Sequence, residues 1–115
     1  MTYELTVHPF EMGTDKEAAV KVLEEAAESF AEWQEYKSYA PTKECIALGY
    51  PECNCEYQCE TYTNPRSHEI RRKCLSDELA DVIQAACNLA DRYGIDLQAA
   101  MERCERRNRD RGRYE

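Results

Sequence analysis

The stretch between Leu75 and Gly94 constrains the fold more than any other part of the chain. Its apolar residues recur at intervals of three and four, which is the spacing of one face of an α-helix. Glycine enters the left-handed conformation of a helix C-cap without strain, so Gly94 marks the end of this helix. Asn64 and Pro65 supply a cap and a first helical residue, which predicts one helix from about Pro65 to Tyr93. The predicted apolar face comprises Leu75, Leu79, Val82, Ile83, Ala86, Leu89, Ala90 and Tyr93.

An earlier segment carries a similar pattern and predicts a first long helix. Thr14 and Glu17 have the spacing of a capping box, in which the Thr hydroxyl satisfies a free backbone amide. Pro41 disfavours a helical residue before it, so this helix should end near Tyr39. Its expected core stripe consists of Ala19, Leu23, Ala26, Ala27, Phe30 and Trp33.

A third, shorter helix is predicted after Asp96, which serves as its cap. Leu97, Ala100, Met101 and Cys104 share one face of this helix. The same face continues to Asn108 and Arg111, so an apolar stripe turns polar at its end. Six arginines lie among residues 103–113, which either balance the negative helix C-terminus or recognise phosphate through their forked guanidinium groups.

Two segments lack a helical pattern. Near the N-terminus, apolar and polar residues alternate over Tyr3–Val7, which predicts a short strand. Residues 40–64 contain four cysteines, two prolines and one glycine, and we expect a Cys-rich insertion or loop with a strand near residues 57–63. The chain has seven cysteines, an odd number, which favours free thiols or a metal site over a disulfide framework.

Composition limits the class of protein. A chain of 115 residues is long enough for one domain, and the three helices predict an all-α fold over residues 1–115. The net charge of −8 argues against a nucleic-acid-binding surface. We find no signal peptide and no apolar run of about 18 residues, so we expect a cytoplasmic protein with no membrane partner.

Two acidic pairs stand one helical turn apart: Glu25 with Glu28, and Glu78 with Asp81. One interpretation is a solvated charged face on which Lys21 pairs with Glu25. The other is that the four carboxylates converge between neighbouring helices. Such a cluster repels itself unless it holds a cation, and hard oxygen donors suit Mg²⁺ or Mn²⁺.

The segments that carry these acids resemble the MazG-like nucleoside triphosphate pyrophosphohydrolases, an all-α family. The resemblance rests on residues 24–28 (EEAAE), 77–82 (DELADV), 94–97 (GIDL) and 106–114 (RRNRDRGRY). It implies a MazG-like helical bundle in which Glu25, Glu28, Glu78 and Asp81 hold Mg²⁺ over the triphosphate and serve catalysis. The implied reaction is attack of water on the α-phosphorus, with release of pyrophosphate.

The resemblance also implies contacts to the substrate. Asn108 and Arg111 match the Asn and Arg that the family carries on a later helix. Cys104 takes the place of the family's Lys at that motif, so Arg103 or Arg107 would substitute for it. Lys21, beside the first acidic pair, and Trp33, an aromatic residue suited to stacking on a base, complete the candidate substrate-binding residues.

Three helices cannot cover both an apolar and an acidic face, which predicts a homo-oligomer with the acids inside a four-helix bundle. The resemblance implies a homodimer or homotetramer. Two alternatives to the enzyme stay open, a non-catalytic helical regulatory or binding module and a zinc-stabilised protein. The zinc ligands would be Cys45, Cys53, Cys55 and Cys59, whose spacing contains no Cys-x-x-Cys pair and so favours reduced thiols.

Overall fold

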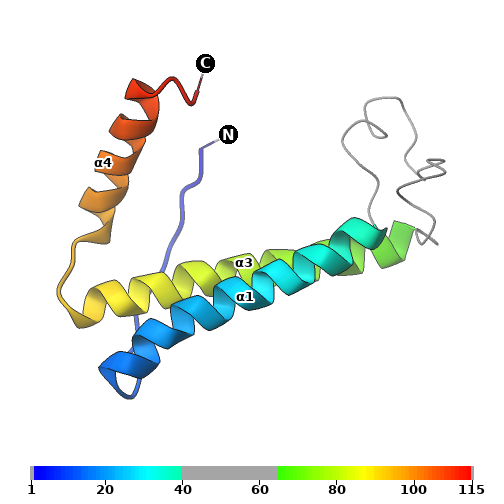
Figure 1. Ribbon diagram of the computed structural model, residues 1–115, viewed down its shortest axis with the longest axis horizontal. Helices are drawn as coiled ribbons and strands as arrows, with labels where there is room; N and C mark the ends of the chain where they lie inside the picture. Colours follow the sequence, from blue (N-terminus) through cyan, green and yellow to red (C-terminus); the bar gives the residue numbers. More distant parts are fainter. Residues whose placement is uncertain (1, 40–64, 115) are drawn as a thin grey trace.

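The computed structural model describes residues 2–39 and 65–114, and this part of the chain is all-helical with no strand. α1 and α3 lie side by side in antiparallel orientation, and α4 turns away from the end of α3 (Figure 1). The all-α class and the three predicted helices are therefore confirmed. The helices are α1 (Asp15–Tyr39), α3 (Pro65–Arg92) and α4 (Leu97–Asp110). The Asn64 cap and the Cys-rich segment 40–64 lie outside the described residues.

The helix starts follow from local side-chain chemistry. The Thr14 hydroxyl accepts a hydrogen bond of 3.1 Å from the Glu17 amide, as the capping box predicts. Asp96 accepts a bond of 3.0 Å from the Ala99 amide and so caps α4. Both caps use donors that the first turn of a helix leaves without an intrahelical partner.

Gly94 ends α3 through the backbone alone. Its φ angle of 63° lies in the left-handed region, and an added Cβ would meet no atom within 4 Å. The Gly94 amide bonds to the Asp91 carbonyl at 3.0 Å, and the Ile95 amide bonds to the Ala90 carbonyl at 2.9 Å. This double closure is the Schellman motif, in which glycine is favoured for its conformation rather than for its size.

The segment before α1 is extended, but the predicted strand at Tyr3–Val7 is wrong. A strand needs a neighbouring backbone, and this segment is held instead by polar side chains of α3. Gln84 donates to the His8 carbonyl at 3.0 Å, and Asn88 accepts from the Phe10 amide at 2.9 Å. The backbone of this N-terminal arm is thus bonded by helix side chains where a sheet would supply peptide groups.

Arg92, one turn beyond Asn88, fastens the arm to the start of α1. Its guanidinium donates to the carbonyls of Met12 (2.6 Å) and Gly13 (3.2 Å), and it also pairs with the Asp15 carboxylate. The hydrogen bond and charge of Arg92 lower the pKa of Asp15. One side chain therefore joins the end of α3 to the arm and to the first turn of α1.

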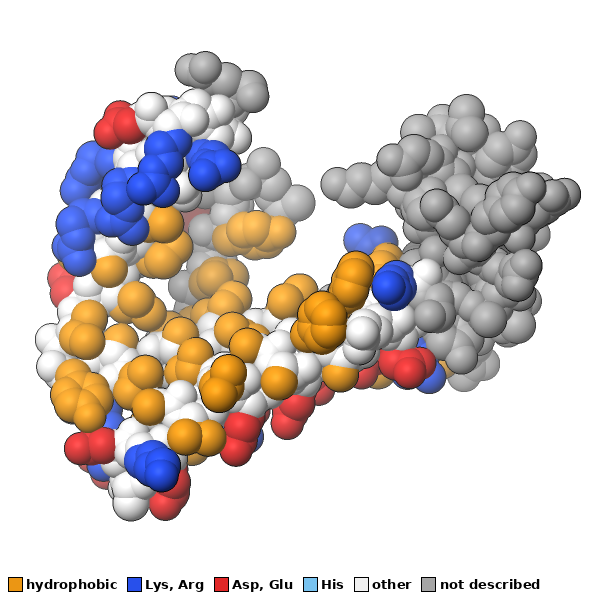
Figure 2. Space-filling model, in the orientation of Figure 1, with side chains coloured by type: hydrophobic (Ala, Val, Ile, Leu, Met, Phe, Trp, Pro, Cys, Tyr) orange, Lys and Arg blue, Asp and Glu red, His pale blue; other side chains and the backbone are white. Residues whose placement is uncertain are grey.

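The apolar side chains in the interior of the described chain are all small. The buried apolar residues are Ala18, Ala85 and Ala90, and no large side chain is fully buried. The core stripe that we expected on α1 is wrong, because Leu23 is 70% exposed and Phe30 58%. Figure 2 shows that many hydrophobic side chains gather on the outward face of α1 and α3. α1 packs against α3 through another stripe, which includes Ala18, Glu25 and Ser29.

Among the described helices, none combines the length and the apolar character needed to cross a membrane.

Replacing Gly94 by Ala should lower the free energy of unfolding by about 1 kcal/mol, because a Cβ disfavours the left-handed conformation. Urea denaturation measures this difference. Gly94→Asn is the matched control, since asparagine visits this region more readily and should cost less. Equal stability of the Ala variant and the parent would contradict the conformational role of Gly94.

Candidate metal centre

Three of the four predicted acids meet between α1 and α3. Glu25 of α1 and Glu78 and Asp81 of α3 each offer one carboxylate oxygen, and these atoms lie within 4.8 Å of one another. We call these residues the acidic triad. The one-turn spacing of Glu78 and Asp81 places both on the side of α3 that meets α1. The sequence leaves a solvated face and a convergence of four acids open, and the structure brings three of the four together.

Glu25 is the most enclosed member of the acidic triad. It is only 6% exposed, although it carries a charge. Its Oε1 lies 2.9 Å from the Lys21 ammonium, whereas its Oε2 is buried with no hydrogen-bond partner. The hydrogen bond from Lys21 lowers the pKa of Glu25, and burial opposes that shift. The Lys21–Glu25 pair expected for a solvated face is thus present, but on a face that packs against α3.

Glu78 differs from Glu25 because no described cation bonds to its carboxylate. Its Oε2 is also buried without a partner. Burial, followed by the charges of Glu28 and Asp81, raises the pKa of Glu78. Glu28 itself is exposed and lies outside the acidic triad, close enough to act on it electrostatically. The triad is consequently a partly enclosed cluster with excess negative charge.

A second pair of charged residues in the same helix interface has opposite charges. Seven residues along each helix from Glu25 and Glu78, Glu32 faces Arg71 with 3.6 Å between the charged atoms. At this position α3 supplies a guanidinium, while at the triad it supplies another carboxylate. Like charges at such positions destabilise the interface unless a cation lies between them. At the acidic triad the bonded cation is Lys21 of α1 itself, and α3 supplies none among the described residues.

Ser29 adds a further polar atom to this interface. It lies one turn after Glu25, is 9% exposed, and its buried hydroxyl has no hydrogen-bond partner. The sequence pattern does not single out Ser29 or the Glu32–Arg71 pair. Glu32 lies seven residues after Glu25, and Arg71 lies seven residues before Glu78. This spacing predicts the pair only once the register of the two helices is known.

The donor set fits a hard divalent cation. Carboxylate oxygens are the ligands of Mg²⁺, Mn²⁺ and Ca²⁺, and a softer metal would favour thiolate or imidazole. Buried oxygens of Glu25 and Glu78 without a partner have lost water and gained no hydrogen bond, which costs free energy that a bound cation would offset. Glu25, Glu78 and Asp81 are thus the residues that would hold the ion.

The space beside the triad on α3 is filled, although the side chains there are small. Ala85 and Asn88 lie one and two turns beyond Asp81 on the same side of the helix. Each is only 4% exposed, and Asn88 bonds to Phe10 of the N-terminal arm. The arm and α1 occupy this space.

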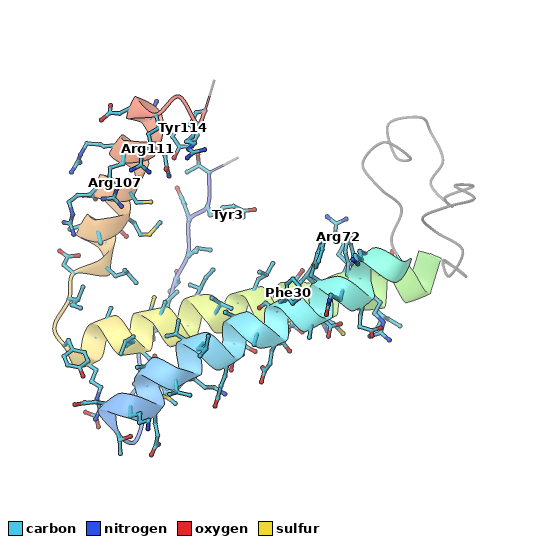
Figure 3. The ribbon with its side chains drawn as sticks, in the orientation of Figure 1. Tyr3, Phe30, Arg72, Arg107, Arg111 and Tyr114 are labelled. Carbon is cyan, nitrogen blue, oxygen red and sulfur yellow. The ribbon has the colours of Figure 1, made fainter. Side chains whose placement is uncertain are left out.

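The remaining candidate residues are not brought to the acidic triad within one chain. Trp33 is 44% exposed on the outward apolar surface, where it lies against Phe30 (5.6 Å between ring centres) and below the Lys37 ammonium (4.7 Å). Asn108 lies on α4 and Arg111 is the C-cap of this helix, which stands apart from the α1–α3 pair (Figure 3). The Asn108 amide donates to the Cys104 sulfur at 3.6 Å. Their contact with substrate stays a prediction.

Comparison with protein-family models, with curated proteins and with solved structures finds no match to this chain.

The Glu78→Gln variant of the metal-free protein should melt at a higher temperature than the parent at pH 7. A raised pKa means that the ionised carboxylate is less stable in the folded protein than in the unfolded chain. Ionised Glu78 therefore destabilises the fold above its pKa, and the neutral amide removes this penalty. Differential scanning calorimetry without divalent cations measures the shift.

Asp77→Asn is the control for net charge, because Asp77 is an exposed neighbour on the same helix. It should shift the melting temperature less. A Glu78→Gln protein that melts no higher than the Asp77→Asn protein would contradict the repulsion assigned to the triad.

Proposed function

We propose that the chain is a MazG-like, Mg²⁺-dependent nucleoside triphosphate pyrophosphohydrolase, with Mn²⁺ as an alternative ion. One observation supports it above the others: Glu25 Oε2 and Glu78 Oε2, on two packed helices, are both buried and have no hydrogen-bond partner among the described residues, and their carboxylates meet at the triad. The resemblance supplies the reaction, and the segment 40–64 would be an insertion that the family pattern does not require.

In the proposed reaction a water oxygen bonds to the α-phosphorus, and the bond from that phosphorus to the β-phosphate oxygen breaks. The products are a nucleoside monophosphate and pyrophosphate. Mg²⁺, when bound, would neutralise phosphate charge and acidify the water. Glu25, Glu78 and Asp81 would hold the ion. Glu28, exposed beside them, is available to orient the water and accept its proton.

The positive charge needed to bind the phosphates lies on α4. Lys and Arg side chains gather over this helix (Figure 2), and Arg107 and Arg111 project from it (Figure 3). Guanidinium groups bind phosphate oxygens in a forked geometry. We propose that Asn108 and Arg111 contact the phosphates, with Arg103 or Arg107 in place of the family's Lys. Lys21 already pairs with Glu25, and this favours a role toward the metal over direct substrate binding.

A second copy of the chain would complete the fold. Alanines are the only apolar residues that the described helices bury, and this is too little apolar contact for a stable domain. The exposed apolar surface of Leu23, Phe30, Leu79 and Ile83 offers what is missing. We propose a homodimer, or a tetramer of such dimers, with an interface of about 2,000 Å² over this surface. Glu28 and Asp81 are exposed beside the seam, so the triad would stay open to a nucleotide at the edge of the dimer.

The Asp81→Asn protein should lose at least about two orders of magnitude in rate, or roughly 3 kcal/mol of barrier stabilisation, because it lacks one metal ligand. The assay follows pyrophosphate release from ribo- and deoxyribonucleoside triphosphates with and without Mg²⁺. Asp77→Asn removes the same charge from the exposed side of α3 and should keep near-parent activity.

Asp81→Asn activity close to the parent rate would refute the metal assignment. A parent protein that releases no pyrophosphate from any of these nucleotides would favour the non-catalytic module instead.

Phe30→Asp should separate the copies, because it places a charge on the apolar surface. Light scattering on the parent should give a multiple of the 13.4 kDa chain mass, and the variant should approach one chain. Ala31→Asp introduces the same charge at a neighbouring exposed position, more than a quarter turn around α1, and should leave the assembly intact. A parent that is monomeric and fully active would rule out the proposed dimer.

A further inference from the structure

Lys21 occupies one of the two oxygens of the most enclosed triad carboxylate. Its ammonium lies 2.9 Å from Glu25 Oε1 and 3.8 Å from Glu24 Oε2. The lysine is one helical turn before Glu25, so the helix itself holds the pair together. The Lys21 side chain is 39% exposed, whereas that of Glu25 is 8% exposed. The ammonium therefore closes Glu25 Oε1 from the solvent side.

The other oxygen of Glu25, Oε2, has no such neighbour among the described residues. Oε2 is buried and has no hydrogen-bond partner, in a residue that is more than nine-tenths buried. Ser29, one turn further along α1 and also nine-tenths buried, presents a second polar atom without a partner. A cation in the acidic triad would thus find one oxygen of Glu25 open and the other engaged.

We propose that Lys21 makes the metal site selective for Mg²⁺ over Ca²⁺, an inference that rests on the proposed metal site. Ca²⁺ takes six to eight oxygens and commonly binds a carboxylate through both of them, whereas Mg²⁺ takes six ligands in a strict octahedron and keeps waters. A glutamate restricted to one oxygen serves Mg²⁺ fully and deprives Ca²⁺ of a ligand. Lys21 is in this sense a positioning residue.

The charge of Lys21 acts differently from its hydrogen bond. An ammonium repels any divalent cation, and at one distance it repels Mg²⁺ and Ca²⁺ equally because their charges are equal. Loss of this repulsion would strengthen both affinities by the same factor. The ratio of the two affinities therefore isolates the number of available oxygens.

The test is calorimetric titration of the nucleotide-free protein with MgCl₂ and, separately, with CaCl₂. Lys21→Met keeps most of the side-chain volume and removes the ammonium. We expect it to raise the Ca²⁺ affinity relative to the Mg²⁺ affinity by about tenfold, because Ca²⁺ gains a second carboxylate oxygen and Mg²⁺ has no use for it. Lys21→Arg retains a donor and should keep a ratio near that of the parent.

Lys16→Met is the matched control, because Lys16 is an exposed lysine in the first turn of the same helix. It should leave the ratio unchanged. If Lys21→Met changes both affinities by one factor, or changes neither, selectivity does not come from Lys21 and the inference fails.

Pyrophosphate release by the parent separates this inference from the proposed function. A parent that binds Mg²⁺ with the expected dependence on Lys21 but hydrolyses no nucleotide would refute the enzyme and leave the selectivity intact. A parent that hydrolyses nucleotides while Lys21→Met keeps the parent ratio would refute the selectivity alone. A parent that binds neither ion at millimolar concentration overturns both.

Discussion

The structure is organised around three carboxylates that meet where two helices pack. Burial of Glu25 against Glu78 and Asp81 removes water from like charges, and this opposes the association of α1 with α3. Lys21 neutralises part of that charge from the same helix. The α1–α3 pair therefore packs at an electrostatic cost, because carboxylates occupy positions where a helix pair normally buries apolar side chains.

The layers of the α1–α3 interface explain how the pair tolerates this cost. Ala18 and Ala85 are buried and small, so the helices can approach closely at one end. Glu32 and Arg71 form an ion pair at the other end. Between them the triad has excess negative charge. The carboxylates of the candidate metal centre thus lower the stability of the interface that contains them. The large apolar residues lie on another side of the helices, where a second copy is proposed to cover them.

The sequence predicts those parts of the fold that depend on interactions between residues a few positions apart in the chain. Capping by Thr14 and Asp96, the end of α3 at Gly94 and the helix bounds follow from short-range spacing and from side-chain chemistry. The same short range explains why Glu78 and Asp81 share a face. The strand expected at Tyr3–Val7 fails for the converse reason, since a strand depends on a distant partner, and α3 side chains bond the arm instead.

Sequence periodicity by itself determined three amphipathic helices and two acidic pairs at one-turn spacing. It did not determine which stripe of α1 would face α3, because a helical wheel ranks faces by apolar content and contains no information about the neighbouring helix. The tertiary structure decided that Glu25 turns inward and Phe30 outward, and that Glu28 remains beside the triad. The physical reason is register: two antiparallel helices meet at fixed seven-residue steps, and only their pairing shows which charges face each other.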